Sequence, residues 1–117
     1  VAAEVQNGGL AVPAATAVAP TWYRDATALY RRDAMGLIGE LNLQIAGFSL
    51  NGDIGASVPA GEAHARISAA KSGDVIISHI NQPKRPAGAG VIAGILALKT
   101  RGFGFVHLDD VTIARTA

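Results

Sequence analysis

The sequence predicts an α/β fold built on a parallel sheet. Half of the 117 residues are hydrophobic and 16% are charged, so the chain can bury a core. Past residue 20, short apolar runs alternate with segments of helical periodicity. Strands that alternate with helices imply right-handed crossovers, which join parallel strands. We therefore expect the order β-α-β-α-β-α-β within a single domain.

Four short apolar segments predict the strands. Residues 21–24 form a short aromatic segment, and 103–108 (FGFVHL) close the series. Between them, 44–50 (QIAGFSL) and 74–80 (DVIISHI) are nearly continuous apolar runs, which are typical of strands buried on both faces of a parallel sheet. We expect one parallel strand at each of these four positions.

Three segments between these runs have helical periodicity. Residues 33–43 begin at Asp33, a residue suited to cap a helix, and 59–70 begin with a proline. Residues 88–100 end just before Gly102, which fits the position after a helix C-terminus. The positions expected to face the core are Ala34, Leu37, Ile38, Leu41, Ala63, Ile67, Ala70, Val91, Ile92, Ile95 and Leu98.

Residues 1–20 are rich in Ala and Val, with two prolines and no positive charge. We expect them to form an extended lead-in to a domain at 21–117. The segment lacks the basic start and unbroken apolar stretch of a secretory signal. The chain also lacks an initiating Met, so we expect it to be processed or part of something longer.

Composition excludes several kinds of site and partner. Without cysteine there is no disulfide, thiolate metal site or cysteine nucleophile. The net charge is +1 and like charges form no block, so neither nucleic acid nor an anionic membrane is an expected partner. No apolar run reaches the ~20 residues that a membrane-spanning helix needs.

Polar side chains follow three of the predicted strands. Because sites in parallel sheets gather at the carboxyl ends of strands, we expect Arg24, Asp53 and His79 to converge on one cleft. His79 could transfer a proton near neutral pH or cap a backbone carbonyl. Asp53 could orient that imidazole or simply form the turn in Asn-Gly-Asp. Arg24 could clamp a carboxylate or be solvated, as we expect for Arg31 and Arg32.

Two further patterns are weaker. His64, His79 and His107 lie far apart, and no pair has the helical spacing of a zinc site, so no metal site is expected within this chain. The run KRPAGAG at 84–90 could cradle a phosphate at a helix start or could be a flexible loop, because it lacks the spacing of a glycine-rich nucleotide motif.

Four segments together resemble the C-terminal half of NodB-type polysaccharide deacetylases. They are 23–28 (YRDATA), 45–57 (IAGFSLNGDIGAS), 73–83 (GDVIISHINQP) and 98–110 (LKTRGFGFVHLDD), and the likeness extends over 21–115. The resemblance implies half of a distorted (β/α) barrel. It also implies a hydrolase that removes N- or O-acetyl groups from carbohydrates with one divalent metal, expected to be Zn²⁺, and an extracytoplasmic location.

The resemblance also implies roles for individual residues. His79 matches the general acid that protonates the leaving amine. Asp53 matches the carboxylate that tunes this histidine, with Asn51 as a competing match because the loop length differs. Arg24 matches the arginine that holds a catalytic base. Thr27 stands where the family has a tyrosine whose backbone N–H helps to bind the oxyanion.

The sequence departs from the family in its metal half. The family's Asp-Asp pair and His-x-x-x-His motif are not found here, so a missing N-terminal half, in the same gene or a second chain, is the implied partner and holder of the metal. A half-barrel has open edges, which predicts pairing with that half or with another copy of this chain. The alternative is a non-catalytic α/β interaction module that has lost the metal half.

Overall fold

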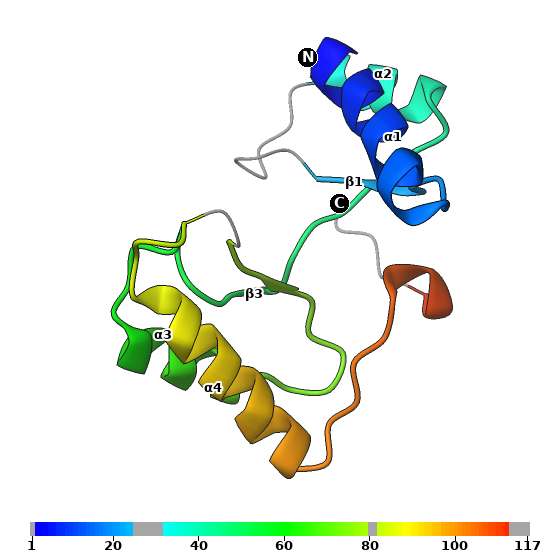
Figure 1. Cartoon of the computed structure of the whole chain (residues 1–117). Helices are drawn as coiled ribbons and strands as arrows, with labels where there is room; N and C mark the ends of the chain where they lie inside the picture. The colour runs from blue at the N-terminus through cyan, green and yellow to red at the C-terminus, as the bar shows by residue number, and fades with distance from the viewer. Residues whose placement is uncertain (1, 25–31, 80–81, 113–117) are drawn as a thin grey trace. The chain divides into compact units, whose positions relative to one another are not determined.

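The computed structural model describes residues 2–24, 32–79 and 82–112 (Figure 1). The chain divides into two compact units, Val1–Gly47 and Phe48–Ala117. Each contains one pair of parallel strands, and each is described below on its own. Within the described residues, no helix is both long enough and apolar enough to cross a membrane.

The N-terminal segment is helical, so our expectation of an extended lead-in was wrong. Helix α1 spans Ala2–Thr16. Alanine is the strongest helix former, and here its abundance outweighs the proline that lies inside the helix, Pro13. The helix ends where Ala17 takes a left-handed φ of 61° and donates its N–H to the Pro13 carbonyl at 2.8 Å.

A parallel strand pair forms the centre of the first unit. Strand β1 (Trp22–Tyr23) pairs with β2 (Gln44–Ile45), in the register Trp22 to Gln44. Helix α2 (Arg32–Glu40) lies between them in the chain and carries the fully buried Ile38. It overlaps the predicted helix at 33–43 but includes Arg32, so Asp33 lies inside the helix and is not its cap. This β-α-β order with parallel pairing follows the sequence pattern.

The second unit repeats the arrangement with other strands. Strand β3 (Leu50–Asn51) pairs in parallel with β4 (Ile76–Ile77), and helix α3 (Ala60–Ser68) connects them. The described residues thus form two two-stranded parallel sheets.

The predicted strand at 44–50 is two strands, β2 and β3, which belong to different sheets. The interruption has a visible cause in the side chain of Arg24. Its Nη2 donates to the Gly47 carbonyl at 2.7 Å, and its Nε donates to the Ala46 carbonyl at 3.4 Å. These carbonyls accept from a guanidinium, which replaces the neighbouring strand that a continuous ladder would need.

The predicted strand at 103–108 is also absent. Residues 103–107 have no regular structure, and a 3₁₀ turn, η1, follows at Leu108–Asp110. Phe103 donates its N–H at 3.0 Å to the Leu98 carbonyl and so closes the preceding helix. Because no strand of the described residues pairs with this segment, Phe105 and Val106 stay exposed.

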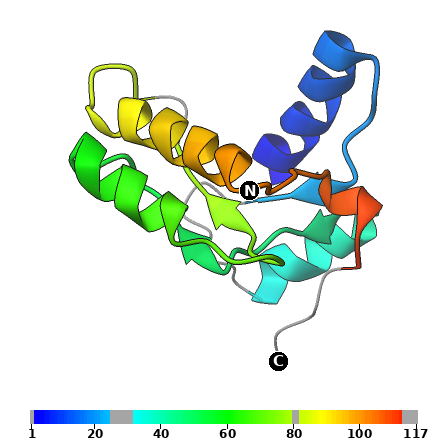
Figure 2. The same cartoon turned by 90° about the horizontal axis from the view of Figure 1, so that it is seen from below.

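Helix α4 (Ala87–Thr100) packs side by side with α3, as Figures 1 and 2 show. A Cβ at Gly90 would overlap the Ala60 carbonyl, and one at Gly94 would lie 2.7 Å from Cβ of Ile67, so only glycine permits this approach. Ile92 is two residues, about 200°, round the helix from each glycine. It therefore points away from α3 and is 62% exposed, which corrects its predicted inward position.

The core of the second unit lies between these two helices and the β3–β4 pair. Ile67, Ala70 and Leu98 are buried there, as the helical periodicity predicted. Leu50 and Ile76 pack against them from the two strands. These contacts pack α3 and α4 against β3 and β4, and the loops that follow β3 and β4 begin at these packed strands.

Candidate functional site

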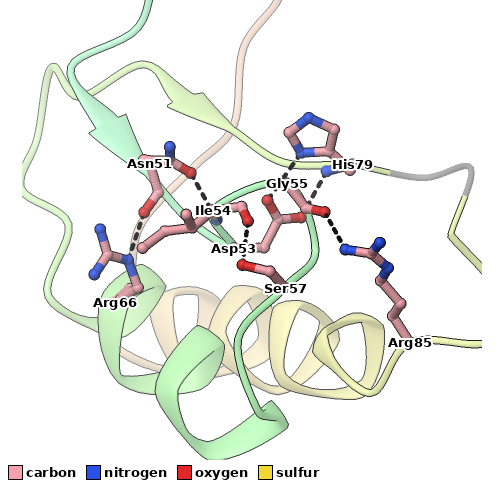
Figure 3. Close-up of polar contacts among 8 residues, drawn as sticks. All are labelled: Asn51, Asp53, Ile54, Gly55, Ser57, Arg66, His79 and Arg85. Atoms are coloured by element: carbon pink, nitrogen blue, oxygen red, sulfur yellow. Dashed lines mark hydrogen bonds and ion pairs between the residues drawn. The ribbon is translucent and has the colours of Figure 1, made fainter. Parts of the chain in front are cut away.

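The candidate site is a carboxylate–histidine pair at the carboxyl ends of β3 and β4. Asp53 follows β3 and His79 follows β4, so the parallel pairing of the strands brings the two residues together (Figure 3). Nδ1 of His79 lies 3.0 Å from Oδ1 of Asp53, and the backbone N–H of His79 donates to Oδ2 at 2.6 Å. The predicted contact between these residues is thus confirmed.

The two side chains differ in their exposure to solvent. The Asp53 side chain is fully buried, whereas that of His79 is 29% exposed. Because an ionised carboxylate can only accept hydrogen bonds, Nδ1 must carry the proton of this contact. The other ring nitrogen, Nε2, points away from Asp53 (Figure 3). It is therefore the nitrogen that can exchange a proton with a ligand.

Asp53 keeps its charge despite burial. Burial acts to raise the pKa of the carboxyl, but the hydrogen bonds from the N–H and ring of His79 and from the N–H of Ala56 outweigh it. The net result is a pKa below the ordinary value of an aspartate. An anion fixed in this way holds the ring of His79 in one orientation and stabilises it whenever it is protonated.

A left-handed loop follows Asp53. Ile54, Gly55 and Ala56 all have positive φ, at 47°, 66° and 61°. This backbone conformation is costly for the β-branched Ile54 in particular. Two side chains hold the loop: the amide oxygen of Asn51 accepts the Ile54 N–H at 2.8 Å, and the Ser57 hydroxyl donates to the Ile54 carbonyl at 2.6 Å (Figure 3).

Two arginines anchor the backbone around this loop. Nε of Arg66 on α3 donates to the carbonyl of Asn51 at 2.8 Å, which fixes the end of β3. Nη1 of Arg85 donates to the carbonyl of Gly55 at 3.3 Å. The backbone is thus anchored on both sides of Asp53, at Asn51 by Arg66 and at Gly55 by Arg85 (Figure 3).

The other predicted site residues are Asn51, Arg24 and Thr27. The Asn51 amide oxygen accepts the Ile54 N–H in an Asx-type turn, and its predicted role in the site stays a prediction. Arg24 lies in the unit Val1–Gly47, where it binds the carbonyls of Ala46 and Gly47, and its predicted role at a carboxylate stays a prediction. Thr27 lies outside the described residues.

Sequence reasoning missed Ala56 and Arg85. Nothing in the residue type of Ala56 signals that its N–H reaches a buried carboxylate, because the contact depends on a left-handed backbone. Arg85 did stand out in KRPAGAG, but as a candidate phosphate ligand. Its contact with Gly55 depends on how the turn at 82–86 meets the loop after Asp53.

Within the described part of the chain, no group of three or more His, Asp or Glu side chains could hold a metal ion. Both carboxylate oxygens of Asp53 face His79 and are buried, so this pair is not the start of an open metal site. Neither a protein-family model nor a curated protein sequence matches the chain.

Proposed function

We propose that this chain supplies the general-acid side of a metal-dependent carbohydrate deacetylase-like hydrolase, as half of a distorted (β/α) barrel of the NodB type. The observation that carries the proposal is the 3.0 Å contact between Nδ1 of His79 and the buried Asp53 carboxylate. The resemblance of 21–115 to the family supports it independently, because the family's acid and its carboxylate partner match the same two residues.

The pair suits the departure of an amine. When water adds to an acetamide, the carbon–nitrogen bond breaks readily only if the nitrogen is protonated, since an amide anion is a poor leaving group. Protonated His79 can give its Nε2 proton to that nitrogen, which releases acetate and the free amine. Asp53 stabilises the imidazolium before the transfer, and its contact with Nδ1 keeps Nε2 aimed at the ligand.

The metal must be held elsewhere. In such hydrolases a divalent ion, expected here to be Zn²⁺, activates the attacking water. The described residues offer no group that could hold this ion, and the proposal, following the resemblance, places its ligands in the missing N-terminal half. The acetylated carbohydrate would then bind between that half and the edge carrying His79. The extracytoplasmic location implied by the family is part of the same proposal.

The proposal is tested by acetate release. The complete domain, obtained from the parent reading frame upstream of Val1, should release acetate from an N-acetylated oligosaccharide such as chitotetraose when Zn²⁺ is present. His79→Ala should reduce turnover by about 10²–10⁴-fold, the usual contribution of a positioned general acid. His64→Ala, which removes an exposed histidine from α3, is the matched control and should retain turnover. Full activity of the His79→Ala enzyme would refute the role.

A non-catalytic interaction module is the second candidate. Ile92 and Leu96 lie one turn apart on α4 and are 62% and 57% exposed, a pairing of large apolar side chains that favours a contact surface. A module would release no acetate with any divalent ion, even with its complete parent chain. Its partner binding would also be unaffected by His79→Ala and weakened by Ile92→Ser. These outcomes are opposite to those expected of the hydrolase.

A further inference from the structure

Arg85 joins the two loops that form the candidate site. It belongs to the turn at 82–86, where its own N–H donates to the Gln82 carbonyl at 3.1 Å. Its Nη1 donates to the carbonyl of Gly55, two residues after Asp53 (Figure 3). The guanidinium therefore links the segment downstream of His79 to the loop that carries its carboxylate partner.

A second, apolar contact links the same segments. Ala56 and Ala87 belong to one buried cluster, in which they are 3% and 0% exposed. Ala87 is the first residue of α4, two positions after Arg85. Ala56 is also a left-handed residue, and its N–H donates to Asp53. The strained conformation that points this N–H at the carboxylate is thus held by packing on one side and by Arg85 on the other.

We propose that Arg85 is a positioning residue: its bond to Gly55 keeps the left-handed loop closed and thereby holds the Asp53 carboxylate against His79. Any effect of Arg85 on catalysis rests on the hydrolase proposed above. The positioning itself is a property of this chain and can be measured without turnover. It does not require Arg85 to touch a substrate.

Loss of the Arg85 bond to Gly55 should open the loop after Asp53 locally. A loop held in left-handed conformation relaxes when a tether is removed, since the unstrained backbone is lower in energy. Relaxation would withdraw the carboxylate from the backbone N–H of His79. That N–H would then exchange with solvent more often, while the amide of Leu98, a residue of α4 that is buried in the core, would open only with the whole unit.

Amide hydrogen exchange in the 117-residue chain tests this proposal. Arg85→Gln should raise exchange at the N–H groups of His79 and Ala56 by about two- to tenfold, the range expected for the loss of one hydrogen bond. Exchange at Leu98 should not change. The His79 Nδ1–H proton signal, sharpened by its carboxylate contact, should broaden in the variant.

Arg101→Gln is the matched control. Arg101 also is exposed, also donates to a backbone carbonyl, that of Ser68 at 2.5 Å, and lies at the opposite end of α4. The same loss of charge there should leave His79 and Ala56 protected. If Arg85→Gln raised exchange at Leu98 and His79 by the same factor, Arg85 would merely stabilise the unit and the proposal would be overturned.

Unchanged exchange at His79 would overturn the proposal as well. The test separates this inference from the proposed function. If the complete domain releases no acetate, the hydrolase proposal fails whatever Arg85→Gln does to exchange. If acetate is released and His79 stays protected in Arg85→Gln, only the positioning role fails.

Discussion

Replacing Asp53 by asparagine should destabilise the unit Phe48–Ala117 strongly. The carboxylate accepts the N–H of His79 at 2.6 Å, the ring Nδ1–H at 3.0 Å and the N–H of Ala56, and its side chain is fully buried. Asparagine offers one acceptor oxygen. Its NH₂ group would either face the His79 N–H, which leaves a buried donor without a partner at about 1–3 kcal/mol, or face Nδ1 and force the ring proton onto Nε2; in both cases the remaining bonds lose their charge assistance. We expect a total loss of about 2–4 kcal/mol.

Asp74→Asn is the control for this change. Asp74 also accepts two hydrogen bonds, from the Ser49 hydroxyl and the Lys71 N–H, both at 2.7 Å. It is exposed, so water can replace a lost partner and the cost should be much smaller. Urea unfolding of both variants at pH 7, followed by far-UV circular dichroism, compares them directly.

Tryptophan fluorescence offers an internal reference. The single tryptophan, Trp22, lies in the unit Val1–Gly47, so its transition reports on the unit without the mutation. Far-UV dichroism sums helices α1 to α4, so Asp53→Asn should move only the part of the transition contributed by α3 and α4 to lower urea, without a matching shift at Trp22. Equal destabilisation by Asp53→Asn and Asp74→Asn would show that burial of the carboxylate does not set its contribution.

The pH dependence of this difference follows from the pKa of Asp53. That pKa is lowered in the folded chain, so the unfolded chain binds the proton more readily and acid favours unfolding. The stabilisation is complete above the ordinary aspartate pKa of about 4 and is lost as the pH falls through the lower folded value. The difference in free energy of unfolding between wild type and Asp53→Asn should therefore change little from pH 6 to pH 5 and narrow as the pH falls below about 4. A constant gap would contradict this linkage.

Two further predictions concern packing and the broken strand. Gly90→Ala places a methyl group on the Ala60 carbonyl and should lower the free energy of unfolding in urea by about 1–3 kcal/mol, as overpacking usually does. In the control Gly88→Ala, on the same helix, the new methyl group meets nothing within 4 Å and should cost nothing. Equal effects of the two substitutions would argue against a tight α3–α4 contact. Arg24→Ala removes the donors to the Ala46 and Gly47 carbonyls and should speed exchange at the Ala46 N–H, which bonds β1; unchanged exchange would mean that the guanidinium does not hold this segment.

The helices of the second unit were predictable because their signals are local. Apolar residues at helical spacing, a proline at the start and a glycine just past the end predict α3 and α4 within a residue or two. Which face of α4 points inward was less predictable from the sequence. We assigned Ile92 to the core from the helical spacing of the apolar residues, whereas the close contact with α3 is made at Gly90 and Gly94. Which face of an apolar helix is buried depends on the neighbour that it meets.

The strand errors have a common origin. An apolar run becomes a strand only if its backbone finds a neighbouring ladder. The carbonyls of Ala46 and Gly47 bind Arg24, so the ladder is interrupted in the middle of the first run, and Phe103 donates its N–H to the end of α4 at the start of the second. The hydrophobic periodicity of QIAGFSL and FGFVHL does not reveal these competing hydrogen bonds, because they depend on contacts with other segments of the chain.

The candidate site, too, was predictable from the sequence only in part. Residue type and position place an acidic side chain after β3 and a histidine after β4, and parallel pairing then predicts that Asp53 and His79 meet. Their chemistry depends on more: a carboxylate removed from water, three donors around it, and a left-handed loop held by Asn51 and Arg85. Those features require segments distant in the chain to meet at fixed distances, and local propensity contains no such information because it describes each segment alone.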